Sequence, residues 1–216
     1  MKKGFIFDLD GVITDTAKYH YVAWKQLADE LGISIDLKFN EQLKGISRID
    51  SLERILEYGG KSKQYSTAEK EALAEKKNTE YVQLLQDLTP ADLLPGVEAF
   101  LQAAAAKNVP CGIASASKNG PFILEKLGIK EQFSVIVDPS LLKKGKPDPE
   151  IFLRAAKDLG IEPSEAVGFE DAPAGIVAIK AAGMYAVGVQ TEEVLEGADQ
   201  VVSRLDELSV DELLAK

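Results

Sequence analysis

The chain has 216 residues, of which 45% are hydrophobic, and its net charge is −10. This is enough for one sizeable core, or for one domain with a smaller insertion. The acidic charge argues against binding to nucleic acids or anionic membranes, since both need basic patches. No apolar run reaches the roughly 18 residues that span a bilayer, and no signal-peptide pattern follows Lys2 and Lys3. We therefore expect a soluble cytoplasmic protein.

Short apolar segments alternate with segments of helical pattern along most of the chain. Proline near the start and glycine just after the end mark several of the helices. Strands that alternate with helices predict an α/β fold, with a Rossmann-like parallel sheet covered on both faces. The predicted strands are 4–7, 111–114, 133–137, 166–169 and 185–189. The predicted helices of this part are 96–106, 121–127, 149–159 and 173–182.

The alternation is interrupted after the first strand. Over more than 75 residues no convincing strand appears, and four segments have helical patterns: 15–31, 40–44, 50–58 and 67–88. We predict an exposed loop over 58–66. The sequence thus predicts a core domain made of residues 1–14 and 91–216, with a four-helix domain inserted at 15–90.

Polar side chains follow each of the first four strands. In a parallel sheet, ligands bind at the carboxyl ends of the strands, so these side chains are the candidates for a site. Each group also has a plain interpretation as a solvated turn, a helix cap or a surface charge. Their joint occurrence favours a site, because carboxylates gathered at one edge repel unless a cation lies among them. The candidates are Asp8, Asp10, Ser115, Ala116, Ser117, Lys118, Asn119, Lys146, Glu170 and Asp171.

The cation that suits these residues is Mg²⁺, which prefers oxygen ligands and often works with phosphates. Asp8, a main-chain oxygen near Asp10, and Glu170 or Asp171 could hold one ion per chain. Ser115 and Lys146 are suitable for holding a phosphoryl group.

Other kinds of site are excluded by composition. The chain has one histidine and one cysteine, His20 and Cys111, so neither a His-rich zinc site nor an internal disulfide is possible. We expect Cys111 to be a buried, inert thiol. No phosphate-binding P-loop and no dinucleotide-binding glycine pattern is present.

Four stretches resemble the motifs of the haloacid dehalogenase superfamily, in order and at suitable spacing: "FDLDGVITDT", "ASASKNG", "GKPDP" and "GFEDAPAG". Two more, "DGVITDTAKYHYVAW" and "NEQLKGISRIDSL", are similar to the β-phosphoglucomutase family within it. The resemblance covers essentially the whole chain and identifies the inserted helices as a cap. It implies Mg²⁺-dependent interconversion of β-D-glucose 1-phosphate and glucose 6-phosphate, with β-glucose 1,6-bisphosphate as intermediate and activator.

The resemblance also implies roles for core residues. Asp8 would be the nucleophile that becomes an aspartyl phosphate, and Asp10 the general acid/base. Lys146, Ser115 and the amide of Ala116 would surround the transferring phosphoryl group. The metal would be held by Asp8, Asp10, Glu170 and Asp171.

For the cap, the resemblance implies a second phosphate site and a sugar pocket. Arg48 would hold the second phosphate together with Ser117, Lys118 and Asn119 of the core. His20 would help to position Asp10 once the cap closes, and Thr16 would lie at the hinge. Lys77 would approach the sugar, although its neighbour Lys76 is an alternative. The other expected pocket residues are Lys44, Gly45, Ser47, Ser51 and Trp24, the last chiefly through packing.

Two alternative functions share most of these residues. A sugar-phosphate phosphatase would use the same nucleophile but transfer the phosphoryl group to water. A non-catalytic sugar-phosphate sensor would keep the fold without turnover, although every expected catalytic position is occupied. We expect small sugar phosphates as the partners, no nucleic acid, no membrane, and a monomer.

Overall fold

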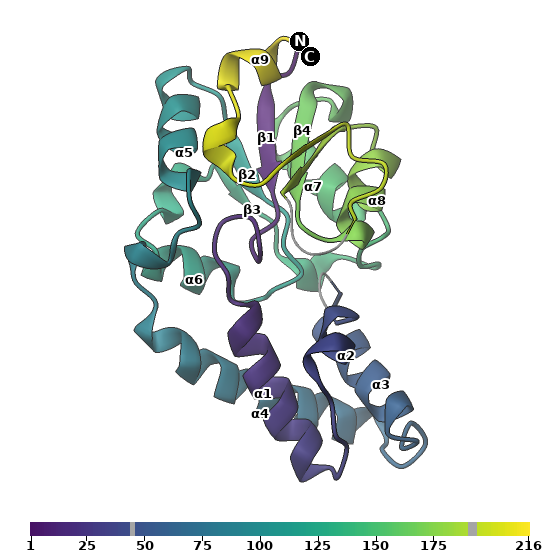
Figure 1. Cartoon of the computed structure of the whole chain (residues 1–216). Coiled ribbons are helices and arrows are strands. Elements are labelled where there is room, and N and C mark those ends of the chain that lie inside the picture. The colour runs from purple at the N-terminus through teal and green to yellow at the C-terminus, as the bar shows by residue number, and fades with distance from the viewer. Residues whose placement is uncertain (44–45, 190–193) are drawn as a thin grey trace. The chain divides into compact units, whose positions relative to one another are not determined.

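The computed structural model describes residues 1–43, 46–189 and 194–216. The chain forms two compact units (Figure 1). Unit 1 consists of Met1–Asp15 and Leu88–Lys216, and unit 2 is Thr16–Asp87. Unit 2 is thus an insertion between the first strand of unit 1 and the rest of that unit. The predicted Lys44 and Gly45 lie outside the described residues.

Unit 1 is built on a parallel sheet whose described strands have the order β3-β2-β1-β4-β5-β6. Five of these strands were predicted, but β3 is shorter than expected. The sixth was missed, because its segment is brief and only partly buried. The strands are β1 (Gly4–Phe7), β2 (Cys111–Ile113), β3 (Val135–Ile136), β4 (Ala166–Glu170), β5 (Tyr185–Val189) and β6 (Gln200–Val202).

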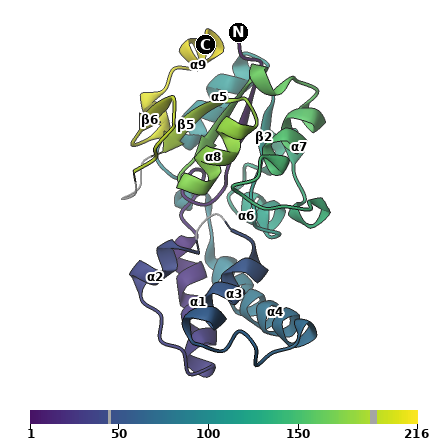
Figure 2. The ribbon, with the colours of Figure 1, turned by 90° about the vertical axis from the view of Figure 1, so that its right-hand side faces the viewer.

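Helices cover both faces of this sheet (Figures 1 and 2). Ile6 of β1 packs in a core with α7 and α8, whereas Phe5 and Phe7 point to the other face and contact Phe100 of α5. Burial on both faces explains why β1 is apolar at every position. The helices of unit 1 are α5 (Val97–Ala106), α6 (Gly120–Lys126), α7 (Glu150–Leu159), α8 (Pro173–Ala181) and α9 (Val210–Leu214).

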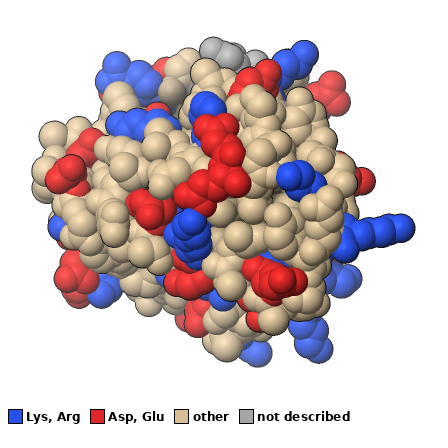
Figure 3. All heavy atoms as spheres, turned by 90° about the horizontal axis from the view of Figure 1, so that it is seen from below, with Lys and Arg blue, Asp and Glu red and all other residues tan. Residues whose placement is uncertain are grey.

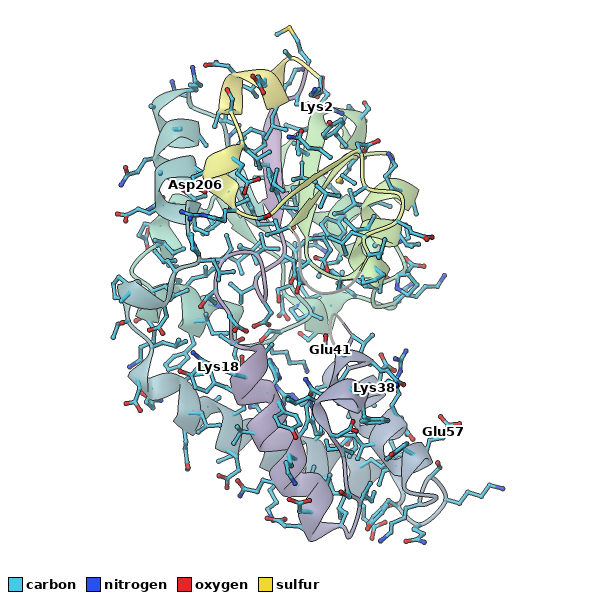
Figure 4. All side chains as sticks on the ribbon, in the orientation of Figure 1. Lys2, Lys18, Lys38, Glu41, Glu57 and Asp206 are labelled. Carbon is cyan, nitrogen blue, oxygen red and sulfur yellow. The ribbon has the colours of Figure 1, made fainter. Side chains whose placement is uncertain are left out.

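The described part of unit 2 contains four α-helices: α1 (Ala17–Glu30), α2 (Leu37–Glu41), α3 (Arg48–Tyr58) and α4 (Thr67–Leu84). Side chains of these helices and of the segments between them form a separate hydrophobic core. Figure 4 draws the described side chains as sticks on the ribbon. The prediction of 40–44 for the second helix was wrong. Asp36 caps it by accepting a hydrogen bond from the Phe39 N–H at 2.7 Å, so α2 begins earlier. The predicted fourth helix ends as α4 at Leu84, and a 3₁₀ turn follows at Leu85–Asp87.

Among the described residues, no helix has the length and apolarity that crossing a membrane requires. On the face shown in Figure 3, the described Lys and Arg side chains alternate with Asp and Glu.

Candidate active site

The pairing register brings the polar strand ends of unit 1 to one edge. Phe7 of β1 pairs with Ile113 of β2 on one side and with Phe169 of β4 on the other. The chain continues past these three paired residues into the polar segments. Asp8 still belongs to the sheet edge, because its N–H donates to the Phe169 carbonyl at 2.9 Å. The predicted convergence of the first, second and fourth strand ends is therefore present.

Lys146 links two carboxylates at this edge. Its ammonium donates to Asp8 Oδ1 at 2.6 Å and to Glu170 Oε2 at 3.2 Å, and all three side chains are buried. Burial alone would lower the pKa of Lys146, but the two carboxylates outweigh it and raise that pKa above its ordinary value. Burial and the Asp8 carboxylate raise the pKa of Glu170 well above its usual range. One lysine thus faces two buried carboxyl groups and cannot pair with both charges.

The same cluster fits a divalent cation. Asp8, Glu170 and Asp171 each offer a carboxylate oxygen, and these oxygens lie within 4.8 Å of one another. Glu170 Oε1 is buried and has no hydrogen-bond partner among the described residues. An unsatisfied buried carboxylate oxygen beside two others is the donor set that Mg²⁺ prefers.

Two glycines make room for these carboxylates. A Cβ on Gly11, whose φ is +79°, would lie 2.0 Å from Asp171 Oδ2. A Cβ on Gly175 would lie 2.0 Å from the Glu170 carboxyl carbon. Both carboxylates therefore depend on the absence of a side chain at a neighbouring position.

The segment after β2 forms consecutive hydrogen-bonded turns. Ser115 Oγ accepts the Ser117 N–H at 3.1 Å, and Ser117 Oγ accepts the Asn119 N–H at 3.3 Å. Ser115 is buried, Ala116, Ser117 and Asn119 are partly buried, and Lys118 is exposed. Of this group, the structure places Ser115 deepest.

In unit 2, three predicted residues meet around one tyrosine. The Lys77 ammonium lies 2.7 Å from His20 Nδ1, and both side chains contact the Tyr81 ring. Tyr81 in turn donates a hydrogen bond to Thr16 Oγ1 at 3.0 Å. Trp24 is 3% exposed, in keeping with a packing role. Lys77 is buried, whereas the alternative lysine, Lys76, is exposed and pairs with Glu30.

The remaining predicted cap residues lie at the start of α3. Ser47 caps this helix by accepting the Asp50 N–H, and the buried Ser51 hydroxyl donates to the Ser47 carbonyl. Arg48 forms an ion pair with Glu75 at 2.9 Å.

Sequence reasoning missed Tyr81 and Gly175. Tyr81 is the last residue of the stretch "EKKNTEY", in which Lys77 was singled out, but Tyr81 itself was given no role. A further signal was its spacing of four residues from Lys77 on one helix. Gly175 was read as part of a helix. Cys111 is buried, as predicted, and burial raises the pKa of its thiol to about 12, which disfavours the reactive thiolate.

The family model of the haloacid dehalogenase-like hydrolases matches residues 2–183. The chain belongs to the haloacid dehalogenase-like hydrolase family. The sequence resemblance and the α/β fold with a helical insertion are thereby confirmed. The buried acidic cluster is the feature of this haloacid dehalogenase-like protein that could hold a metal.

Three proteins are similar to this haloacid dehalogenase-like chain over most of its length. A β-phosphoglucomutase of Bacillus subtilis is 51% identical over 97% of this chain and 92% of its own length. The crystal structure of a β-phosphoglucomutase from Clostridium difficile matches with a TM-score of 0.96 and 49% identity, covering 100% of this chain and 96% of that one. A fructose-1-phosphate phosphatase of Escherichia coli is 33% identical over 87% of this chain and 96% of its own length.

Proposed function

We propose that this protein is a Mg²⁺-dependent β-phosphoglucomutase, an isomerase that interconverts β-D-glucose 1-phosphate and glucose 6-phosphate. The observation that carries the proposal is the identity of 51% to the Bacillus subtilis mutase across nearly the whole chain. The cluster of Asp8, Lys146, Glu170 and Asp171 supports it. Phosphoryl transfer needs a nucleophile beside charged groups that stabilise the charge on the transferring phosphoryl group.

In this proposal Asp8 is the nucleophile. One of its carboxylate oxygens forms a bond to phosphorus while the bond from phosphorus to the sugar oxygen breaks. Asp10 gives a proton to the departing sugar oxygen and takes one from the attacking hydroxyl in the second half-reaction. Lys146 holds Asp8 Oδ1 in place and offsets negative charge on the transferring group.

Asp8, Glu170 and Asp171 would hold the metal, with a main-chain oxygen near Asp10. When bound, Mg²⁺ supplies neutralising charge for the phosphoryl oxygens. Ser115 and the amide of Ala116 would bind those oxygens.

The proposed intermediate, β-glucose 1,6-bisphosphate, needs a second phosphate site. We assign it to Arg48 of unit 2 and to Ser117, Lys118 and Asn119 of unit 1. Arginine grips phosphate with two hydrogen bonds, and a ligand held by both units would favour a closed form over an open one. The cytoplasmic location and the monomeric state stay predictions from the sequence.

A sugar-phosphate phosphatase is the second candidate, because the fructose-1-phosphate phosphatase shares 33% identity and the nucleophile would be the same. The two functions differ in whether a sugar hydroxyl or water accepts the phosphoryl group.

Activation by the intermediate tests the choice. With Mg²⁺ and β-glucose 1-phosphate, we expect traces of β-glucose 1,6-bisphosphate to increase the production of glucose 6-phosphate strongly, in a coupled dehydrogenase assay. A rate that does not respond to the bisphosphate would argue against the mutase.

A further inference from the structure

Lys146 reaches the acidic cluster from a loop over 142–149 that contains neither helix nor strand. Its side chain is 1% exposed, although the residues on either side of it in the chain are exposed. Its ammonium nevertheless lies within hydrogen-bond distance of both Asp8 and Glu170. Loops usually vary in position more than the elements that they connect. Holding Lys146 at both carboxylates therefore requires contacts that fix the backbone of its loop.

Glu150 supplies such contacts from the start of α7. Its carboxylate accepts two consecutive backbone N–H groups of the loop, that of Lys143 at 3.0 Å and that of Lys144 at 2.8 Å. The second carboxylate oxygen also accepts the Lys143 N–H, at 3.1 Å. Hydrogen bonds to a carboxylate are stronger than those between neutral groups. One side chain thus ties the segment before Lys146 to the first turn of a helix.

The loop is tied to the same turn on the other side of Lys146. Asp148 Oδ1 accepts the Glu150 N–H at 3.1 Å, and the Asp148 N–H donates to the Gly145 carbonyl at 3.0 Å. Glu150 therefore takes part in hydrogen bonds to residues before and after Lys146. Because the chain is held on both sides of Lys146, the position of its backbone follows that of the helix start.

The same helix contacts the head group of the lysine. The Phe152 side chain is 0% exposed, and its ring centroid lies 5.1 Å from the Lys146 ammonium. A cation over the face of an aromatic ring is attracted to it, most strongly away from water. Phe152 follows Glu150 by two residues in α7. The helix that holds the loop backbone therefore also receives the end of the side chain.

A carboxylate in the first turn of a helix has a plainer interpretation, in which it only balances the helix dipole. Glu98 is an example, because it is the acidic residue in the first turn of α5 and accepts a hydrogen bond from Gln102 of the same helix at 3.3 Å. Glu150 differs from Glu98 because both of its oxygens accept from a loop outside its own helix.

We propose that Glu150 is a positioning residue for Lys146. By holding the N–H groups of Lys143 and Lys144, it determines where the Lys146 ammonium meets Asp8. Glu150 acts through the loop backbone and not on the substrate. The consequence for turnover rests on the proposed function, in which Lys146 offsets negative charge on the transferring phosphoryl group.

The position of Lys146 can be observed without turnover. A buried, ion-paired ammonium exchanges its hydrogens slowly, so ¹H–¹⁵N spectra recorded at low temperature should resolve it. The signal that disappears in Lys146→Met identifies it. Glu150→Gln keeps the size of the side chain, removes its charge and replaces one accepting oxygen by an amide group that only donates. We expect Glu150→Gln to shift or broaden the Lys146 signal.

Glu98→Gln is the matched control, because it removes a first-turn carboxylate that holds no loop. It should leave the Lys146 signal unchanged. A Lys146 signal that is the same in wild type and in both glutamine variants would overturn the positioning role, even if urea titration showed Glu150→Gln to be less stable. A wild type in which no ammonium signal depends on Lys146 would overturn it as well.

Turnover provides the second measurement. We expect Glu150→Gln to lower kcat for isomerisation of β-glucose 1-phosphate about 10-fold, because a small displacement of a charged group weakens its effect on the reacting atoms. KM should change less than about 2-fold, since Glu150 acts through the loop and not on the sugar. Mg²⁺-dependent hydrolysis of acetyl phosphate should slow by a similar factor, because Lys146 serves phosphoryl transfer from either donor.

A kcat for Glu150→Gln equal to that of Glu98→Gln would overturn the positioning role. A change in KM alone would do the same, because it would place the effect on substrate binding. A wild type that does not isomerise the sugar phosphate would refute the proposed function instead. In that case the Lys146 signal of the two glutamine variants still decides whether Glu150 positions the lysine.

Discussion

Asp8 has the central chemical role in the proposed mechanism. Replacing it by asparagine keeps the shape of the side chain but removes the charge and the nucleophilic oxygen. We expect Asp8→Asn to lower turnover at least about a thousandfold while sugar-phosphate binding, measured by calorimetry, persists. Asp206→Asn, at an exposed carboxylate paired with Arg204, is the control and should stay active. Full activity in Asp8→Asn would show that another group is the nucleophile.

Lys146 is the one cation that the structure places between the Asp8 and Glu170 carboxylates, within the described residues. Lys146→Met would leave them buried without it, and we expect the free energy of unfolding to fall by about 3 kcal/mol. Because Mg²⁺ can replace part of the lost charge, urea titrations should show a larger loss in EDTA than in Mg²⁺. Lys144→Met, whose lysine side chain is 71% exposed, should change stability by less than about 0.5 kcal/mol. Equal losses with and without Mg²⁺ would contradict a metal site at this cluster.

At the scale of single elements, the loop after β1 and the strand end of β4 together form the acidic cluster of Asp8, Glu170 and Asp171. Gly11 combines a φ of +79° with close approach to Asp171. Gly11→Ala should therefore displace this carboxylate and weaken Mg²⁺ binding about 10- to 100-fold in a calorimetric titration. Gly183 is the matched control, because its φ is +78° and a Cβ there would meet nothing within 4 Å. If both alanine variants lost the same Mg²⁺ affinity, backbone strain rather than crowding of Asp171 would be the cause.

The elements also show what the sequence could and could not predict. Strands β1 and β5 were predicted with the observed bounds, because they are continuous apolar runs with sharp ends. The residues after β1, β2 and β4 could be grouped from the sequence alone, since parallel strands bring their carboxyl ends to one edge. The Tyr81 contacts could not be predicted from the sequence, because they depend on how α4 packs against α1. No local sequence pattern determines helix packing. The start of α2 was missed because the Asp36 cap outweighed the apolar spacing.

For the whole molecule, the proposal requires the two units to act on one ligand. Arg48 belongs to unit 2 and Lys118 to unit 1. Arg48→Ala should reduce turnover with β-glucose 1,6-bisphosphate more than the rate of phosphoryl transfer from acetyl phosphate, which carries no second phosphate. Arg54→Ala, on the same helix α3, is the control and should affect neither rate. Equal effects of Arg48→Ala on the two donors would contradict a phosphate shared between the units.

The most direct test of the central claim asks where the phosphoryl group goes. Anomer-resolved phosphorus NMR would follow β-glucose 1-phosphate with the enzyme, Mg²⁺ and a trace of β-glucose 1,6-bisphosphate. We predict that the β-glucose 1-phosphate signal is replaced by that of glucose 6-phosphate, with little inorganic phosphate, because Asp8 passes its phosphoryl group to sugar. Release of inorganic phosphate faster than the appearance of glucose 6-phosphate would contradict the mutase and identify the protein as a phosphatase.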